Sequence, residues 1–113
     1  AVSAAVDKLL ACGVTAIHAA TLLTAAAAIA RLHELKLRVP EDVSVVTMHD
    51  DLLARVVYPQ VTTVALPSQE MGRAAASRLI DLIQGTAPDE GSALESLLLP
   101  PGDLIVRASV ASI

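Results

Sequence analysis

Three titratable side chains follow an apolar segment near the middle of the chain. The segment VSVV at 43–46 is rich in β-branched residues, which favour strands, and His49, Asp50 and Asp51 come soon after it. Imidazole and carboxylate groups form hydrogen bonds in fixed directions. Open α/β sheets bind their ligands at the carboxyl ends of parallel strands. The cluster is therefore either a ligand-binding site or an ordinary boundary between a strand and a loop.

A metal site is one chemical possibility for these residues. His18 lies in another apolar segment, and together with His49 and Asp50 it would supply imidazole and carboxylate ligands that suit zinc. The three residues belong to separate segments and lack the compact spacing of a metal-binding motif. We therefore expect no metal.

Enzymatic chemistry is a second possibility. Asp50 and Asp51 resemble the acidic pair of a receiver domain, which also needs a lysine at a later strand end. The chain's only lysines, Lys8 and Lys36, both precede the pair. The sequence contains no nucleophile elbow, P-loop or dinucleotide-binding glycine pattern. We expect a binding domain rather than an enzyme, with no cofactor.

Composition limits the remaining classes of protein. The chain has 113 residues, 54% of them hydrophobic, and its only aromatic residue is Tyr58. Abundant alanine beside valine-rich segments indicates helices packed on a sheet. The net charge is −4 and basic residues are scattered, so this chain lacks the basic surface of a nucleic-acid-binding domain. Cys12 is the only cysteine, which excludes an internal disulfide and suggests a reducing compartment.

The apolar segments are too short to cross a membrane, and no signal peptide is visible. The chain opens without Met, inside a predicted helix, and we interpret it as a fragment.

Hydrophobic spacing predicts an alternation of strands and helices. Such an alternation is typical of an α/β fold with a mainly parallel sheet and flanking helices. Ser68 is expected to cap the last helix, and Gly85 to end it. The predicted helices cover 2–11, 22–35 and 68–84, with a helical turn at 51–57; the predicted strands cover 15–20, 43–48, 61–66, 97–99 and 104–110.

Three sequence blocks resemble the C-terminal part of the lactose/galactose repressor (LacI/GalR) family. They are LRVPEDVSVV at 37–46, VTTVALPSQEMGRAAASRLIDLI at 61–83 and LLLPPGDLIVRAS at 97–109, and their order and spacing fit. The resemblance implies that 1–113 is the C-terminal effector-binding lobe, the second lobe of a Rossmann-like type I periplasmic-binding-protein core. The segment 68–99 is then expected to pack on a first lobe that this chain lacks.

The resemblance also implies a function. LacI/GalR proteins are cytoplasmic, homodimeric transcription regulators that bind a small-molecule effector between their lobes. They contact operator DNA through an N-terminal helix-turn-helix, which is absent from this chain, and they have no membrane segment. A periplasmic solute-binding protein of an uptake system shares the architecture and is the alternative. The block at 61–76 fits the repressors better.

The effector site implied by the resemblance contains two departures from the family pattern. In the family, the strand corresponding to VSVV ends in Gly, an aromatic residue and two Asp, of which the first bonds a sugar hydroxyl. Those four positions are 47–50 here, so His49 replaces the ligand-binding Asp and Asp50 keeps the second. The family's Asn after the preceding strand is replaced by Thr21. We expect Thr21 and His49 to face the effector, with Asp50 orienting His49.

The family also implies a dimer interface on the helix 22–35 and the turn 51–57. Lys36 occupies a position where the family commonly has Gly; if it keeps that backbone conformation, the cost is about 1 kcal/mol. In the isolated chain, the apolar stripe on the helix 68–84 should face water. The predicted interface residues are Thr24, Ala25, Ala28, Leu53, Val56 and Val57; the stripe comprises Met71, Ala75, Leu79, Leu82 and Ile83.

Overall fold

A computed structural model describes residues 1–86 and 98–112 of the chain. They form two compact units. The first contains Ala1–Leu66 and Asp103–Ile113, and the second contains Pro67–Gly102. Each unit is described by itself.

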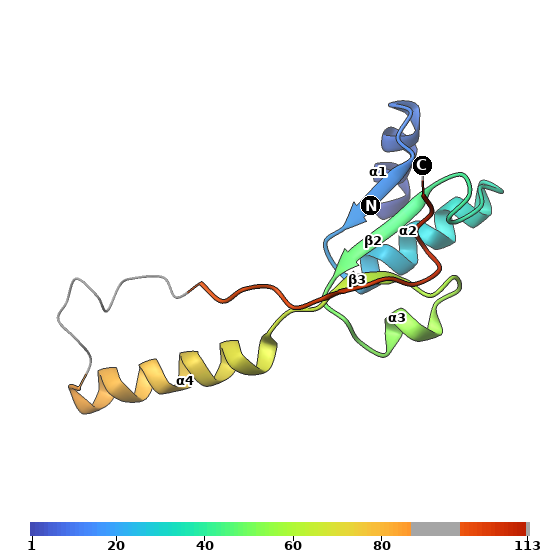
Figure 1. Cartoon of the computed structure of the whole chain (residues 1–113). Helices are drawn as coiled ribbons and strands as arrows, with labels where there is room; N and C mark the ends of the chain where they lie inside the picture. The colour runs from blue at the N-terminus through green and yellow to red at the C-terminus, as the bar shows by residue number, and fades with distance from the viewer. Residues whose placement is uncertain (87–97, 113) are drawn as a thin grey trace. The chain divides into compact units, whose positions relative to one another are not determined.

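The first unit is built on a four-stranded sheet in the order β1-β2-β3-β4 (Figure 1). Strands β1, β2 and β3 run parallel, and β4 is antiparallel to β3. The predicted α/β fold with a mainly parallel sheet is confirmed. The strands are β1 (Ala16–Ala19), β2 (Ser44–Met48), β3 (Thr62–Val64) and β4 (Leu104–Ile105), and the helices of this unit are α1 (Val2–Ala11), α2 (Leu22–Glu34) and α3 (Leu53–Val56).

The core lies between the sheet and α2. Alternate residues of β1 are buried, as the two-residue period of a strand requires, and Val45 is fully buried in β2. Helix α2 covers the strands with side chains at three- and four-residue spacing. Several are alanines, which leave room for α1 to pack closely on the same helix. The buried residues of α2 are Leu22, Ala25, Ala28, Ile29 and Leu32.

Two of the predicted helices are followed by a residue with left-handed backbone, at positions that the sequence indicated. Lys36 has φ 58° two residues after the end of α2, as its position in the family pattern implied. Gly85 has φ 69° after α4 (Ser68–Gln84), where glycine carries no steric penalty.

Helix α4 makes up most of the described part of the second unit, and none of its residues is buried within this chain. The prediction that Ser68 caps it is wrong. The Pro67 carbonyl already accepts the first helical hydrogen bond, from the Met71 N–H at 2.9 Å, so the cap position belongs to Pro67. In the described residues, no helix has both the length and the apolar character needed to cross a membrane.

The two C-terminal strand predictions need correction. The strand 97–99 is not formed at Leu98 and Leu99, and Leu97 lies outside the described residues. The strand 104–110 is reduced to β4, Leu104–Ile105. Beyond Ile105, side chains take up backbone donors that a regular pairing with β3 would use: the Arg107 N–H donates to Thr62 Oγ1 at 2.8 Å, and the Thr62 N–H donates to Ser109 Oγ at 2.8 Å. A regular ladder cannot continue once its donors are used in this way.

Candidate functional site

The ends of β1 and β2 place Thr21 and His49 at the same edge of the sheet. Ala19 pairs with Thr47 in the parallel register, and Thr21 and His49 each follow two residues later. The buried Thr47 hydroxyl donates to the Ala19 carbonyl at 2.8 Å and so ties the two strand ends together. Both predicted contact residues are solvent-exposed. This juxtaposition is the candidate site.

Thr21 has a second role as the cap of α2. It adopts extended backbone, φ −137° and ψ 158°, and its Oγ1 accepts a hydrogen bond from the Thr24 N–H at 3.2 Å. The same hydroxyl lies 2.9 Å from Thr24 Oγ1. A hydroxyl oxygen has two lone pairs and one proton, so Thr21 can cap the helix and still bond a ligand.

His49 occupies a constrained turn. Its φ is 68°, in the left-handed region that non-glycine residues seldom adopt. Its N–H donates to the Val64 carbonyl at 2.8 Å, which tethers the turn to β3 while the side chain remains exposed. Strained backbone of this kind persists where the surrounding contacts determine it, and such positions cluster at functional sites.

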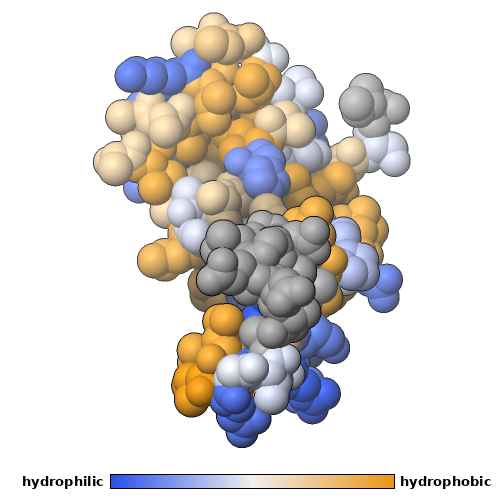
Figure 2. Space-filling model, turned by 90° about the vertical axis from the view of Figure 1, so that its left-hand side faces the viewer, coloured by the Kyte–Doolittle hydropathy of each residue, from blue (hydrophilic) through white to orange (hydrophobic). Residues whose placement is uncertain are grey.

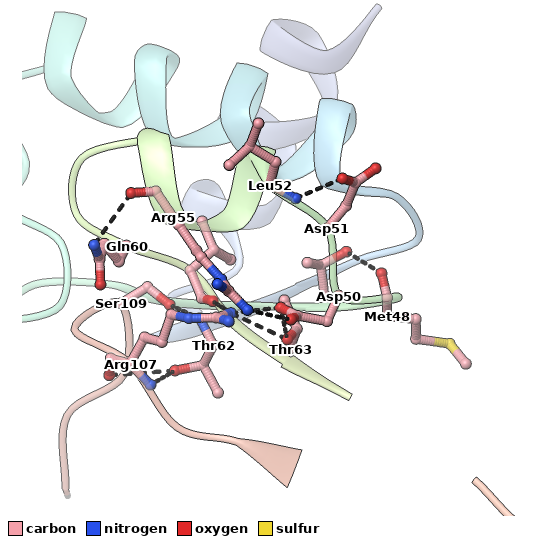
Figure 3. A network of polar contacts seen from close by, with 12 residues as sticks. Met48, Asp50, Asp51, Leu52, Arg55, Gln60, Thr62, Thr63, Arg107 and Ser109 are labelled. Atoms are coloured by element: carbon pink, nitrogen blue, oxygen red, sulfur yellow. Dashed lines mark hydrogen bonds and ion pairs between the residues drawn. The ribbon is translucent and has the colours of Figure 1, made fainter. Parts of the chain in front are cut away.

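Asp50 points away from the exposed edge and into a polar network (Figure 3). Its Oδ1 accepts hydrogen bonds from Arg107 Nη1 at 2.7 Å and Thr63 Oγ1 at 2.8 Å, and Arg55 Nη2 lies 3.8 Å from Oδ2. The hydrogen bond from Arg107 holds the pKa of the Asp50 carboxyl below its ordinary value, against the effect of burial. Among the described residues its partners do not include His49. No direct bond therefore supports the expectation that Asp50 orients His49, which stays a prediction.

Arg107 is a central residue of this network that sequence reasoning missed. Besides Asp50, its Nη1 donates to the Val61 carbonyl at 2.8 Å and to Thr63 Oγ1 at 3.2 Å. Its side chain is only 10% exposed. The sequence did carry a signal, because an arginine inside the apolar segment LIVRASV needs a buried partner of opposite charge.

Ser109 anchors the same segment to the sheet. It donates its hydroxyl hydrogen to the Val45 carbonyl and accepts the Thr62 N–H at 2.8 Å. Its own carbonyl accepts the Val45 N–H at 2.8 Å. The C-terminal segment is thus hydrogen-bonded to both β2 and β3.

The predicted dimer residues divide by exposure. Ala25 and Ala28 are 0% and 2% exposed and pack within this chain's own core, so their assignment to a dimer interface is wrong. Val56 is 65% exposed, while Leu53 and Val57 are half-buried against the core. Thr24 is also half-buried, beside the Thr21 cap.

The second unit carries an apolar groove of about 350 Å³. In the lower part of Figure 2, where α4 lies, apolar side chains gather on one side and hydrophilic residues lie beside them. All members of the predicted stripe are exposed. The groove is lined by Met71, Ala74, Ala75, Arg78, Leu79, Leu82 and Leu99.

The described residues contain no group of three or more His, Cys, Asp or Glu side chains that could hold a metal ion. His18, His49 and Asp50 are not brought together, since His18 lies within β1 and Asp50 turns into its own network. What the geometry offers is hydrogen bonding by one hydroxyl and one imidazole at adjacent strand ends.

Comparison with known proteins gives the family. Residues 2–110 match the model of the periplasmic binding protein-like domain. The chain belongs to this family. As a periplasmic binding protein-like domain it has the predicted Rossmann-like architecture. The predicted resemblance to LacI/GalR regulators is confirmed by its similarity to named regulators of this kind.

Named relatives of this periplasmic binding protein-like domain are regulators. The HTH-type transcriptional regulator MalR of Streptomyces coelicolor is 38% identical over 109 residues, which are 96% of this chain and 30% of MalR. The solved complex of the transcriptional regulator CelR with cellobiose has a TM-score of 0.84 at 37% identity and covers 96% of this chain and 32% of that one.

A third relative is the lac repressor dimer bound to operator and the anti-inducer ONPF. It has a TM-score of 0.77 at 27% identity, with 98% of this chain and 37% of that chain covered. This periplasmic binding protein-like domain therefore spans about a third of the length of these regulators.

Proposed function

We propose that this chain is the effector-sensing part of a LacI-type DNA-binding transcription regulator. The whole protein would bind operator DNA through an N-terminal helix-turn-helix outside this chain, act in the cytoplasm as a homodimer and catalyse no reaction. The observation that carries the proposal is the register of β1 and β2, which presents Thr21 and His49 at adjacent strand ends in a domain whose named relatives are regulators.

The proposed effector is a sugar-like molecule rich in hydroxyl groups. The Thr21 hydroxyl donates and accepts, and a neutral imidazole on His49 does the same through its two nitrogens. Exposed Met48 precedes His49 and adds an apolar surface, of the kind that suits the carbon face of a sugar ring. The CelR structure contains cellobiose, which supports this chemical class. Because a protonated imidazole would favour an anionic effector, a phosphorylated sugar is the second candidate.

The proposal is tested in the full-length regulator by calorimetric titration. A panel of monosaccharides and disaccharides, with cellobiose included, first identifies a sugar that binds. His49→Ala should then weaken binding by about 1–3 kcal/mol, as for the loss of one buried hydrogen bond.

His33→Ala is the matched control for that titration, because His33 is an exposed histidine on α2 and belongs to no predicted site. It should leave the affinity unchanged. Equal affinity in wild type and His49→Ala would refute the site.

We further propose that segment 68–99 packs on the first lobe of the full-length protein. The exposed stripe of α4 supports this, since large apolar side chains such as Met71 and Leu79 lose contact with water when a partner covers them.

Homodimerisation is proposed through α3 and the N-terminal turn of α2, which contains Thr24. Exposed Val56 and half-buried Leu53, Val57 and Thr24 remain as its candidate contacts after the correction of Ala25 and Ala28. The dimeric lac repressor structure supports this assembly.

A further inference from the structure

We propose that Arg107 is a positioning residue of the effector site, which holds the turn Met48–Asp51 in the conformation that presents His49. This inference rests on the proposed function, because it concerns the same site. Arg107 itself would not touch the effector, since its side chain is only 10% exposed and its guanidinium is directed at Asp50 and β3.

The contacts of Arg107 join three segments of the chain (Figure 3). Its Nη1 reaches Asp50 in the turn at 2.7 Å, the Val61 carbonyl before β3 at 2.8 Å and the Thr63 hydroxyl within β3 at 3.2 Å. Arg107 itself lies just beyond β4, in the segment that follows the second unit in sequence. One guanidinium thus connects the effector turn to β3 and to the returning segment.

The turn needs such a connection because its backbone is in an unfavourable conformation. A left-handed φ is unfavourable at a residue with a Cβ, and His49 has φ 68°. Two tethers oppose relaxation of this turn: the bond from the His49 N–H to the Val64 carbonyl, and the Asp50–Arg107 pair one residue later. If the second tether is lost, the turn is free to relax and the His49 ring to leave its position at this edge of the sheet.

The chemistry of arginine explains why this residue type is required. Its planar guanidinium carries five N–H donors in fixed directions and keeps its charge at all relevant pH values. The acceptors here are a carboxylate, a carbonyl and a hydroxyl oxygen from different segments. All three are bonded by Nη1 alone, which lies one bond farther along the side chain than a lysine ammonium would. A lysine would keep the positive charge but would not reach the three acceptors together. Arg107→Lys therefore separates positioning from charge.

The experiment measures local opening of the turn in the full-length regulator. Hydrogen–deuterium exchange is followed by mass spectrometry in the peptide containing Met48–Leu52 and in peptides from α2. Arg107→Lys should speed exchange in the first peptide at least tenfold and leave α2 unchanged. Arg31→Lys is the matched control, because Arg31 also forms an ion pair, with Asp7 at 2.9 Å, but on the helices. It should leave the turn unaffected.

Affinity for the sugar identified by the panel is measured on the same variants. Local loosening together with at least a fivefold loss of affinity in Arg107→Lys supports the inference. Unchanged exchange in the turn, equal acceleration in the turn and α2, or loosening without loss of affinity would each overturn it. If Arg107→Lys does not fold, Asp50→Asn, which keeps the side-chain shape, is judged by the same criteria.

His49→Ala separates this inference from the proposed function. If His49→Ala binds the sugar normally, the effector assignment fails whatever Arg107 does. If His49→Ala loses affinity while Arg107→Lys changes neither exchange nor affinity, the site stands and the positioning role fails.

Discussion

The Nη1 atom of Arg107 lies 2.7 Å from Oδ1 of Asp50, and both side chains are largely buried, at 10% and 16% exposure. This ion pair connects the C-terminal segment with the turn after β2. Removing one partner of a buried pair leaves the other charge without compensation, which destabilises a protein strongly. The pair therefore links stability, pH response and the geometry of the proposed effector site.

The first prediction concerns pH. Because Arg107 lowers the pKa of Asp50 in the folded state, Asp50 contributes stability above the ordinary aspartate pKa of 3.8, and that stability is lost as the pH falls through the lower folded value. Unfolding by urea at a series of pH values should show a smaller loss of stability on acidification in Asp50→Asn than in wild type. An identical acid dependence in the two proteins would contradict the effect of the pair.

The second prediction concerns Asp42, which bonds both the N–H and the guanidinium of Arg38. These bonds lower its pKa to about 2. Carbon-13 NMR titration should therefore show the Asp42 carboxyl ionising well below an ordinary aspartate. In Arg38→Leu the pKa should rise toward 3.8, because only the backbone N–H bond remains; a pKa that stays near 2 would exclude the Arg38 guanidinium as the cause.

The third prediction separates the two roles of Thr21. Thr21→Ala removes the oxygen that caps α2 and should lower the free energy of unfolding by about 1 kcal/mol. Thr21→Ser keeps the oxygen, so stability should remain close to wild type. In the full-length regulator, sugar affinity measured by calorimetry should fall in the alanine variant and persist in the serine variant. A serine variant as unstable as the alanine variant would argue against capping.

The fourth prediction concerns the core. Leu32 is fully buried under the sheet, so Leu32→Ala should lower the free energy of unfolding by about 2–5 kcal/mol. Leu23→Ala is the control, because Leu23 lies on the same helix with its side chain exposed. Urea denaturation of both variants checks the difference. Similar losses in the two variants would contradict the assigned face of α2.

The fifth prediction concerns assembly. In the full-length regulator, Val56→Asp should dissociate a dimer formed through α3, because a charge at an apolar contact loses its hydration. In the isolated chain, Leu79→Asp should instead weaken self-association through the exposed stripe of α4. Light scattering at micromolar concentration measures the molar mass of the full-length regulator and of the isolated chain, each with and without its substitution. A Val56→Asp regulator that remains dimeric would remove α3 from the interface.

Much of this protein's architecture follows from its sequence alone. Helix-period spacing in 22–35 and β-branched segments such as 43–46 predicted α2 and β2, because side-chain period and local propensity act over a few residues. Gly85 and Lys36 marked helix ends, since their left-handed backbone follows from local sterics and from the family pattern. The order of these elements was enough to predict a mainly parallel sheet.

The tertiary structure decided which residues face inward and which polar groups meet. Ala25 and Ala28 suit either a helix contact or a core, and only the packing of α2 on the sheet buries them. Asp50 is adjacent to His49 in sequence, yet its carboxylate is bound by Arg107, which arrives from the far end of the chain. Partners distant in sequence become neighbours only when the chain folds, so local pattern cannot assign them. Strand β4 is shorter than predicted for the same reason. Side chains of β3 and of the C-terminal segment accept the backbone N–H groups that a longer strand would need for pairing.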